Sequence, residues 1–491
     1  MLERYNLSDT SEDIKGIAFE RFLGRTFRGE IGQFFTPRTI VEFMIRMVGP
    51  KEGDVICDPA SGSGGFLIRF FEIVREQILA DIDHQYKEYR EEVEGRKLSE
   101  EKKAELLREK FDELQKSIKS DRKGSRLWKL ANRCIYGTDA NDRMARTSKM
   151  NMIMHGDGHG GVHHHDGFIN VNGIFDGRFD IVLTNPPFGA SVEETDVILE
   201  SDVKVDEDEY ARYVADYGNT YKESQARLRA AAEAIPKKPI ASLFTLPKGE
   251  KSNVKTEILF IERCLSLLKP GGRLGIVLPE GIFNNPSLAY VREFCEDRAF
   301  IRAVVSLPQE TFYSSGASVK ASLLFMQKFT DEEQGQFDKR KKAAEEEIRE
   351  HYQADLDRLM AIIQRPTLKQ ADFLEGIEKP TKEQKDKASQ KAKDANTELK
   401  EQRAKAKKEL KTLEETIRAE ARALLKERFP YPIFLYEAER VGITATGEED
   451  LNELCRYPQD KVPAGIDKTC LELNEEFRQN PESFLLKEGA E

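Results

Sequence analysis

No stretch of the sequence reaches the roughly twenty consecutive apolar residues that a membrane-spanning helix needs. The first residues also lack the pattern of a signal peptide. These two absences predict a cytoplasmic protein without a membrane segment. A basic excess is missing too, because 77 Lys and Arg residues stand against 88 Asp and Glu residues, for a formal net charge of −11. A protein that grips DNA unaided usually carries a basic excess. Strong autonomous DNA binding is therefore not expected, and a local basic groove or a basic partner subunit would have to supply phosphate contacts.

The six cysteines include no C-x-x-C pair and lie mostly in apolar contexts. They are predicted to be buried free thiols rather than disulfides or zinc ligands. A histidine-rich stretch, His163–His165 with His155 and His159 nearby, also fails as a zinc site. Three consecutive histidines cannot all face one ion, and no cysteine is close by. We predict a Gly/His-rich loop there and no metal site.

The composition suits one large α/β domain with charged helical additions. Hydrophobic residues make up 39% of the 491 residues and charged residues 34%, with a mean hydropathy of −0.59. No internal repeats are present. We predict a short helical N-terminal segment (residues 1–50), a main domain (51–330) with a helical insertion at 81–125, a charged coiled-coil helical hairpin (331–428), and a C-terminal tail (429–491) that contacts a partner.

The main domain alternates strand patterns with helical patterns. Strands are predicted at Asp54–Cys57, Cys134–Asp139, Phe179–Thr184, Arg273–Leu278 and Ile301–Leu307. Such alternation predicts a doubly wound, mostly parallel sheet with helices on both faces. A last strand, Ala321–Lys328, follows closely enough to pair antiparallel with the strand before it.

A glycine-rich segment directly follows the first of these strands. Ligands bind at the carboxyl ends of strands in open parallel sheets, which is where Asp58–Phe66 lies. Its glycines let the backbone approach a ligand closely, and Asp58 can accept hydrogen bonds from an amino group. A dinucleotide such as NAD is an alternative, but G-x-G-x-x-G is absent. The early Asp-Pro suits a cofactor that carries an ammonium and a sulfonium rather than a pyrophosphate.

Three further acids are candidates for the same ligand. Asp139 ends the second strand, where an acid holds ribose hydroxyls in doubly wound folds, although a helix N-cap is an equal alternative. Asp166 could meet an adenine amino group, with Phe168 against the ring. Asp157 competes for that role and is otherwise a turn residue.

Asn185-Pro186-Pro187-Phe188 follows the strand Phe179–Thr184 and forms a rigid rim. The Asn185 side-chain oxygen and the Pro186 carbonyl could accept the two N–H bonds of an adenine amino group. Phe188 would stack on a base flipped from the duplex. A strand-ending turn is the structural alternative. With the glycine-rich segment, this rim predicts methyl transfer to an amino nitrogen, driven mainly by positioning and electrostatics.

Four motifs in this order resemble the modification (methylase) subunit of type I restriction-modification systems, an N6-adenine DNA methyltransferase family. The motifs are GQFFTPR (Gly32–Arg38), DPASGSGGF (Asp58–Phe66), GTDANDRMARTSKMNMIMHG (Gly137–Gly156) and NPPF. Similarity runs from about Asp13 to Phe329, with weaker similarity in Glu437–Gly447. LPEGIFNN and LPQETFYSSGASVKASLLF resemble the family's later strands, which shape the base pocket.

The resemblance and the residue patterns together assign roles to individual positions. The predicted cofactor-binding residues are Gln33, Thr36, Pro37, Asp58, Ala60, Gly62, Ser63, Gly64, Asp139 and Asp166. The predicted catalytic residues are Asn185, Pro186, Pro187 and Phe188. The implied fold is a seven-stranded, Rossmann-like methyltransferase sheet with a C-terminal antiparallel hairpin strand. The implied cofactor is S-adenosyl-L-methionine (SAM).

The function that the resemblance implies is methylation of the N6 amino group of a flipped-out adenine. Its implied partners are double-stranded DNA, a separate DNA specificity subunit, a restriction (nuclease) subunit and a second copy of the chain. The family usually carries a sizeable helical domain ahead of the GQF-TP motif, whereas a short segment precedes it here. DNA contacts made by such a domain are therefore not expected from this chain.

Two other functions fit part of the sequence. The NPPF chemistry also serves methyltransferases that act on RNA guanine or on glutamine side chains of proteins, which usually lack the GQF-TP motif. A non-catalytic assembly scaffold with a decayed site is the third reading. The intact set Asp58, Asp139 and Asn185 argues against decay.

Overall fold

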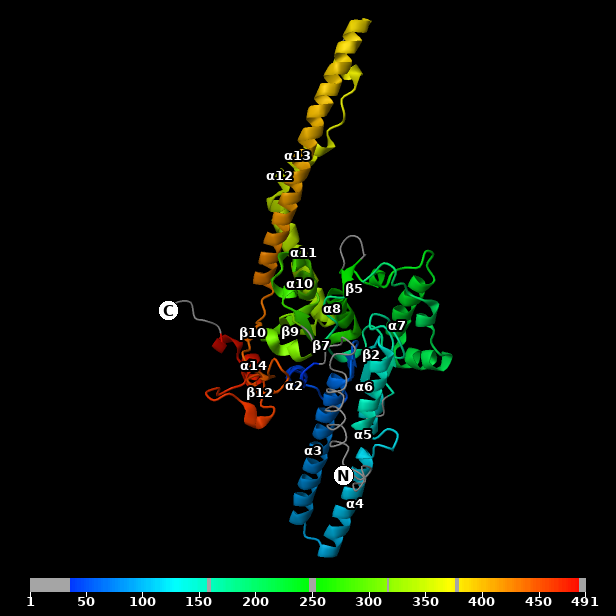
Figure 1. Cartoon of the computed structure of the whole chain (residues 1–491), viewed down its shortest axis with the longest axis vertical. Coiled ribbons are helices and arrows are strands. Elements are labelled where there is room, and N and C mark those ends of the chain that lie inside the picture. Colours follow the sequence, from blue (N-terminus) through cyan, green and yellow to red (C-terminus); the bar gives the residue numbers. More distant parts are fainter. Residues whose placement is uncertain (1–35, 157–159, 247–252, 316–317, 376–378, 485–491) are drawn as a thin grey trace. The chain divides into compact units, whose positions relative to one another are not determined.

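A computed structural model describes residues 36–156, 160–246, 253–315, 318–375 and 379–484 (Figure 1). Residues 1–35 of the predicted N-terminal helical segment, which include Gln33, and Asp157 lie outside these residues. The chain forms two compact units, one from residues up to 330 together with residues from 432 onward, the other from residues 331–431. None of the helices in the described ranges combines the length and apolar character that crossing a membrane requires.

The first unit is built on one eight-stranded sheet with the order β10-β8-β9-β7-β4-β1-β2-β3. Its strands are β1 (Ile56–Asp58), β2 (Ile135–Asp139), β3 (Val162–His164), β4 (Phe179–Thr184), β7 (Leu268–Pro279), β8 (Ala299–Ser306), β9 (Ala321–Lys328) and β10 (Phe434–Glu437). β9 runs antiparallel to both of its neighbours, and all other pairs in the sheet are parallel. The predicted mixed α/β fold with a mostly parallel sheet is confirmed.

Two details of the sheet differ from the prediction. The sheet has eight strands rather than seven, because β10 adds to the edge of β8 in parallel. The histidine-rich stretch is not a loop throughout, because Val162–His164 pairs with β2 as strand β3. Gly161 permits this pairing, since a side chain there would strike the Ile135 carbonyl. Strand β3 lacks the apolar alternation that identifies a strand in sequence, whereas β10 lies in an apolar run whose place in the sheet the sequence does not indicate.

Helices cover both faces of the sheet. They include α2 (Arg38–Val48), α3 (Gly65–Gly95), α5 (Arg126–Arg133), α6 (Asp142–Met154), α8 (Thr256–Leu267) and α10 (Ala289–Glu296). Alternate residues of the strands enter different apolar clusters, as β4 shows beyond its register shift after Phe179: Ile181 and Leu183 pack with α2 and α3, whereas Val182 packs with α8. The period of two therefore puts one core on each face.

Charged helices extend from both units. The predicted hairpin near residues 81–125 is formed by α3 and α4 (Glu100–Ile118), which is capped by the Ser99 side chain. In the second unit, α11 (Asp331–His351) and α12 (Gln353–Gln364) pack along the 47-residue helix α13 (Lys382–Arg428). A capping box of Thr381 and Gln384 begins α13.

The remaining parts of the first unit are an insertion and a C-terminal segment. The insertion after β4 contains β5 (Ser191–Val192), α7 (Glu207–Ala232) and β6 (Val254–Lys255). The C-terminal segment (residues 432–484) contains β10, β11 (Val441–Ile443), β12 (Glu449–Asn452) and α14 (Cys470–Gln479). All six cysteines are buried free thiols, as predicted.

Candidate active site

The glycine loop (residues 58–66) connects the carboxyl end of β1 to α3. The neighbouring strand holds its shape, because Ser61 N donates to the Thr138 carbonyl at 2.8 Å and Thr138 Oγ1 donates to the Pro59 carbonyl at 3.0 Å. Gly64 turns the chain into α3 with a φ of 88°. Such a left-handed conformation favours glycine.

Helix α6 supports the glycine loop from the other side. Asn151 Nδ2 donates to the Ser63 carbonyl at 3.1 Å. A Cβ atom at Gly64 would lie 2.6 Å from Ser148 Oγ, so a side chain there would force the Ser148 hydroxyl to move. The loop is thus fixed by both β2 and α6.

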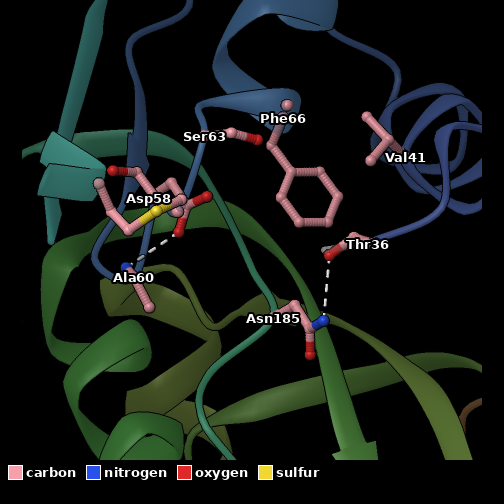
Figure 2. Close-up of a pocket in the computed structure, with 11 residues that line it drawn as sticks. Thr36, Val41, Asp58, Ala60, Ser63, Phe66 and Asn185 are labelled. Carbon is pink, nitrogen blue, oxygen red and sulfur yellow. Dashed lines mark hydrogen bonds between the residues drawn. The ribbon is translucent and has the colours of Figure 1, made fainter. Parts of the chain in front are cut away.

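A pocket opens in front of this loop (Figure 2). The empty space between its lining residues, open solvent included, is about 440 Å³. It is lined by Thr36, Val41, Asp58, Ala60, Ser61, Gly62, Ser63, Gly65, Phe66, Met144 and Asn185. Residues predicted from three separate motifs thus lie together around one cavity, although they are far apart in the sequence.

Sequence reasoning missed the apolar wall of this pocket. Val41 comes from α2, Phe66 from the first turn of α3, and Met144 from the first turn of α6. Phe66 ends the DPASGSGGF motif, and Met144 lies in the same motif as Asp139. Both therefore lie within recognised motifs, but neither was predicted to bind the cofactor. Nothing in the local pattern of Val41 separates it from an ordinary core residue.

Asn185 lies at the carboxyl end of β4, beside β1. Its Nδ2 donates to Thr36 Oγ1 at 3.0 Å, as Figure 2 shows. Its Oδ1 is buried and accepts no hydrogen bond from any group in the described part of the chain. A buried acceptor without a partner carries a desolvation cost. It is also the arrangement that an incoming N–H donor would complete.

The rest of the NPPF segment (residues 185–188) lies outside the lining of the pocket. Pro186 is buried and Pro187 is exposed. Thr256 Oγ1, at the start of α8, donates to the Pro187 carbonyl at 2.8 Å. Phe188 is half-buried and packs against the core cluster that contains α2 and α3. Pro37, at the N-terminus of α2, also lies outside the pocket lining.

Asp58 is the carboxylate of the pocket. Its side chain is 1% exposed, and Oδ1 accepts from Ala60 N at 3.0 Å. Burial raises the pKa of Asp58 to about 7. A cation entering the pocket would lower this pKa again, because an opposite charge favours the ionised carboxyl.

Asp139 stands behind the glycine loop at the end of β2. Its Oδ2 accepts from Gly62 N at 2.9 Å and its Oδ1 from Asn141 N at 2.8 Å. Burial raises the pKa of Asp139, against the effect of these two hydrogen bonds. The alternative that Asp139 caps α6 is wrong, because Asn141 is the N-cap of that helix.

Asp166 lies after β3, outside the pocket lining. A side chain at Gly167 would strike the Pro59 carbonyl, so this turn sits directly against the glycine loop. Arg263 Nε holds the turn by donating to the Gly167 carbonyl at 2.9 Å. The expectation that Phe168 lies against the adenine ring is wrong. Its side chain is 5% exposed and packs between Phe244 and Phe260 in the core.

The histidines near the site face different partners. His164 Nε2 lies 3.1 Å from the Ala140 carbonyl, and His165 Nδ1 lies 3.2 Å from the Asp166 carbonyl. Burial lowers the pKa of His163 to about 4. Across the described residues, no group of three or more His, Cys, Asp or Glu side chains is placed to hold a metal ion.

Comparison with known proteins connects these features to one family. The model of the family described as N-6 DNA Methylase matches residues 10–103, 112–222 and 240–407. The match covers all the motifs of the pocket and continues into α13 of the second unit.

Curated relatives share part of the chain. It is 23% identical over 302 residues to the type I restriction enzyme EcoEI methylase subunit of Escherichia coli, covering 61% of this chain and 43% of that protein. It is 22% identical over 306 residues to the EcoKI methylase subunit of Escherichia coli strain K12, covering 61% and 41%. The chain thus spans less than half the length of these relatives.

Two solved structures are also similar. A modification subunit of a putative type I restriction enzyme from Vibrio vulnificus YJ016 is 21% identical with a TM-score of 0.40, covering 66% of this chain and 51% of that chain. A putative class I SAM-dependent methyltransferase from Listeria monocytogenes is 16% identical with a TM-score of 0.40, covering 67% and 72%.

Proposed function

Because this chain belongs to the N-6 DNA methylase family, we propose that it transfers a methyl group from SAM to the N6 amino group of an adenine in DNA. We propose further that it acts as the modification subunit of a type I-like complex, in which a separate specificity subunit selects the adenine.

The observation that carries this proposal is the state of the Asn185 amide. Its Nδ2 is anchored to Thr36, so the amide cannot rotate freely. Its Oδ1 is buried without a partner from the described residues and belongs to a residue that lines the pocket. A buried acceptor held in this way is preorganised for an N–H donor, and an exocyclic amino group is such a donor.

The pocket residues fit SAM. Asp58 can pair with an ammonium, and Gly62 and Gly65 line the pocket without side chains, which leaves room for a ligand beside the backbone. Val41, Phe66 and Met144 offer apolar contacts. Asp139 and Asp166 extend this set towards the ribose and adenine of the cofactor. Bound SAM would supply a methyl group on a positively charged sulfur, and on transfer the methyl–sulfur bond would break and the sulfur would leave as a neutral thioether.

Asn185 and Pro186 would act on the target base. The Asn185 Oδ1 and the Pro186 carbonyl accept the two N–H bonds of the adenine amino group, which pulls the nitrogen towards tetrahedral geometry. Its lone pair, otherwise delocalised into the ring, becomes available to form the new N–C bond. Phe188 stacks on the extruded base, and the extra proton on the nitrogen is lost to water after transfer. Positioning and electrostatics supply the rate.

We assign the choice of the target adenine to a partner because the net charge of this chain is negative. A net charge of −11 is unfavourable for holding DNA phosphates. A DNA specificity subunit would contribute those contacts and select the adenine. The relatives named above are methylase subunits of type I restriction enzymes, so a restriction subunit and a second copy of this chain are further partners to test.

The test uses labelled SAM, DNA, and the chain with and without a specificity subunit encoded beside it. We expect N6-methyladenine in the digested DNA only when the specificity subunit is present. Methylation at one defined sequence by the isolated chain would refute the dependence on a partner. Label in RNA or in glutamine side chains, with none in DNA, would replace the DNA assignment by one of the alternative amino-methyltransferase activities.

A further inference from the structure

Helix α2 has almost no face towards water. Nine of its eleven residues are buried, including the two polar residues Thr39 and Glu42, which are 9% and 0% exposed. A helix that lies on a sheet normally exposes its polar stripe. Here other parts of the first unit cover that stripe.

The C-terminal segment covers Thr39. Thr39 Oγ1 donates to the Val441 carbonyl in β11 at 2.6 Å. The next residue, Gly442, has a φ of 81° at a register shift between β11 and β12. A Cβ atom there would lie 2.5 Å from Thr39 Cγ2. Glycine therefore allows the segment to approach α2 this closely.

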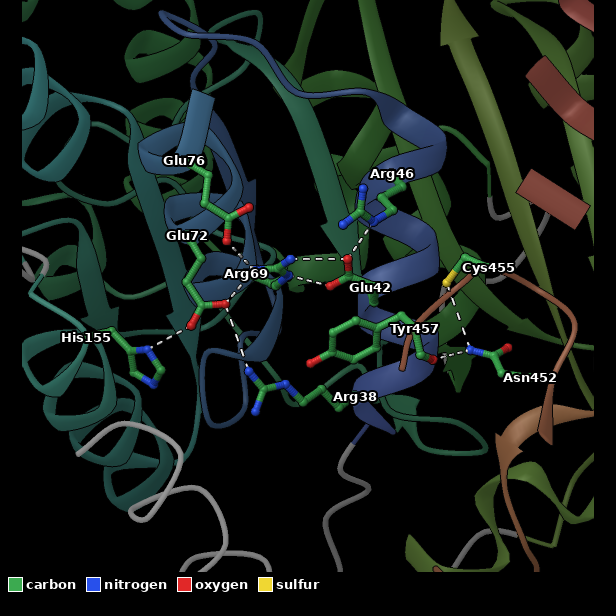
Figure 3. Close-up of polar contacts among 10 residues, drawn as sticks. All are labelled: Arg38, Glu42, Arg46, Arg69, Glu72, Glu76, His155, Asn452, Cys455 and Tyr457. Carbon is green, nitrogen blue, oxygen red and sulfur yellow. Dashed lines mark hydrogen bonds and ion pairs between the residues drawn. The ribbon is translucent and has the colours of Figure 1, made fainter. Parts of the chain in front are cut away.

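A second contact joins the same segment to α2 and α3 together (Figure 3). The Glu42 carboxylate is bound by Arg46 at 2.5 Å and by Arg69 Nη2 at 3.2 Å. The Arg69 guanidinium lies 5.9 Å from the centre of the Tyr457 ring. A fully buried carboxylate needs such partners, because an unpaired buried charge is strongly unfavourable. Tyr457 thus closes over the ion pair that ties the two helices.

Both of these helices begin at the pocket. Thr36 precedes α2 and Val41 lies in it, while Gly65 and Phe66 form the first turn of α3. Behind them, α3 is also tied to the end of α6, since Glu72 Oε1 lies 3.0 Å from His155 Nδ1. Movement of α2 away from β4 would carry Thr36 away from Asn185, which it anchors.

We propose that the C-terminal segment is a positioning element of the pocket: through Gly442 and Tyr457 it fixes α2, so that Thr36 holds Asn185 and Val41 meets the cofactor. Gly442 and Thr39 are then positioning residues for a reaction whose chemistry takes place elsewhere. The inference concerns residues more than 400 positions apart in the chain. It rests on the proposed function for the identity of the cofactor, but its geometry does not depend on that identity.

The experiment compares Gly442→Ala with Gly465→Ala in the full chain. Both glycines belong to the C-terminal segment and have positive φ, 81° and 90°. A Cβ atom at Gly465 has no heavy atom within 4 Å, whereas one at Gly442 meets Thr39. The two substitutions thus share the backbone strain and differ in the contact with α2.

Two measurements are made at a temperature where both variants are folded. Equilibrium binding of radiolabelled SAM is expected to weaken about tenfold in Gly442→Ala relative to Gly465→Ala, because small displacements of positioning groups are costly. Amide hydrogen exchange is expected to rise in Arg38–Val48 and around Asn185, with β1 and β2 unchanged. Adding Thr39→Ser removes the methyl group that the new Cβ meets and keeps the hydroxyl, so it should restore most of both properties. A purely structural role would lower the melting temperature without changing affinity in the folded state.

A milder variant guards against failure of Gly442→Ala to fold. Thr39→Val keeps the shape of the side chain and removes the hydrogen bond to Val441, so the same changes are expected at smaller size. Equal SAM affinity and equal exchange in Gly442→Ala and Gly465→Ala would overturn the inference. If the unmodified chain binds SAM but methylates no DNA, the proposed function fails and the affinity comparison still decides the inference. If the unmodified chain does not bind SAM, the amide hydrogen exchange of α2 and of the residues around Asn185 in the two glycine variants decides whether the C-terminal segment positions α2.

Discussion

The glycine loop and the NPPF segment follow adjacent parallel strands, yet they use their polar groups in opposite ways. The loop is tied at several points, through the Thr138 backbone and side chain and through Asn151. In the NPPF segment, the Asn185 amide is held through its nitrogen, whereas its oxygen has no partner among the described residues. Under the proposed function, the first would supply shape for a cofactor, and the second would supply an acceptor for a reacting group.

The largest effect is expected from removing the open acceptor. Asn185→Ala should lower the rate of methyl transfer by roughly 10²–10³-fold, the size seen when one preorganised hydrogen-bonding group is lost from an active site. SAM affinity should change little, because the glycine loop is untouched. Single-turnover transfer and equilibrium binding measure the two quantities. Asn132→Ala, which removes an exposed amide, is the control. Undiminished transfer by Asn185→Ala would remove Asn185 from the mechanism.

The next effect concerns the shape of the glycine loop. Gly64→Ala should weaken SAM binding by roughly tenfold, because it adds left-handed strain and a clash 2.6 Å from Ser148 Oγ. Gly53→Ala is the matched control, since Gly53 has a φ of 92° and open space around its Cβ position. Combining Gly64→Ala with Ser148→Ala should recover part of the affinity. Equal affinities for Gly64→Ala and Gly53→Ala would show that the loop does not shape the binding site.

A smaller effect is expected from releasing the anchored end of Asn185. Thr36→Val removes the acceptor for Asn185 Nδ2 and should slow transfer about fivefold, the value of one hydrogen bond. Thr36→Ser keeps the hydroxyl and should behave like the unmodified chain. The comparison uses rates at saturating SAM and DNA, so that binding does not enter. If the valine and serine variants have the same rate, the anchor has no role in orienting Asn185.

The smallest effect is a pH dependence that belongs to the loop alone. The pKa of Asp58 is raised to about 7 by burial, so its neutral carboxyl stabilises the cofactor-free fold below its unfolded pKa of 3.8, and this contribution is lost as pH rises through 7. SAM binding needs the ionised form and should strengthen about twofold between pH 6.5 and pH 7, below the range in which the α-amino group of SAM loses its proton. Titration calorimetry measures it, and Asp58→Asn should bind weakly with no such slope. A profile for the unmodified chain that is flat across this range would contradict the role given to Asp58.

Local patterns in the sequence predicted where the glycine loop and the NPPF segment lie in the fold. Phe179–Thr184 and Ala321–Lys328 were predicted with the bounds that the structure gives, because apolar β-rich runs bounded by turn residues identify a buried strand. The carboxyl ends of such strands meet at one edge of the sheet, which brought Asp58 and Asn185 together in prediction and in the structure. Which of the site residues bind cofactor or base stays a prediction.

Long-range contacts were not accessible in the same way. The hydrogen bond of Thr36 to Asn185 spans 149 positions, and that of Thr39 to Val441 spans 402. Neither leaves a periodic signal, because each depends on how separate elements pack. Strand β10 was missed in the sheet for the same reason: its partner, β8, lies on the far side of the whole second unit in sequence. Phe168 was assigned to the pocket from its neighbour Asp166, but packing against Phe260 turned its ring into the core.

The distance between Asn185 Oδ1 and the adenine N6 tests the central claim most directly. It can be measured in a structure of the chain with a specificity subunit, target DNA and a non-reactive SAM analogue. We expect the two atoms about 3 Å apart, with Asn185 Nδ2 still on Thr36. A structure in which a protein N–H occupies Oδ1, while the adenine amino group lies elsewhere, would contradict the account.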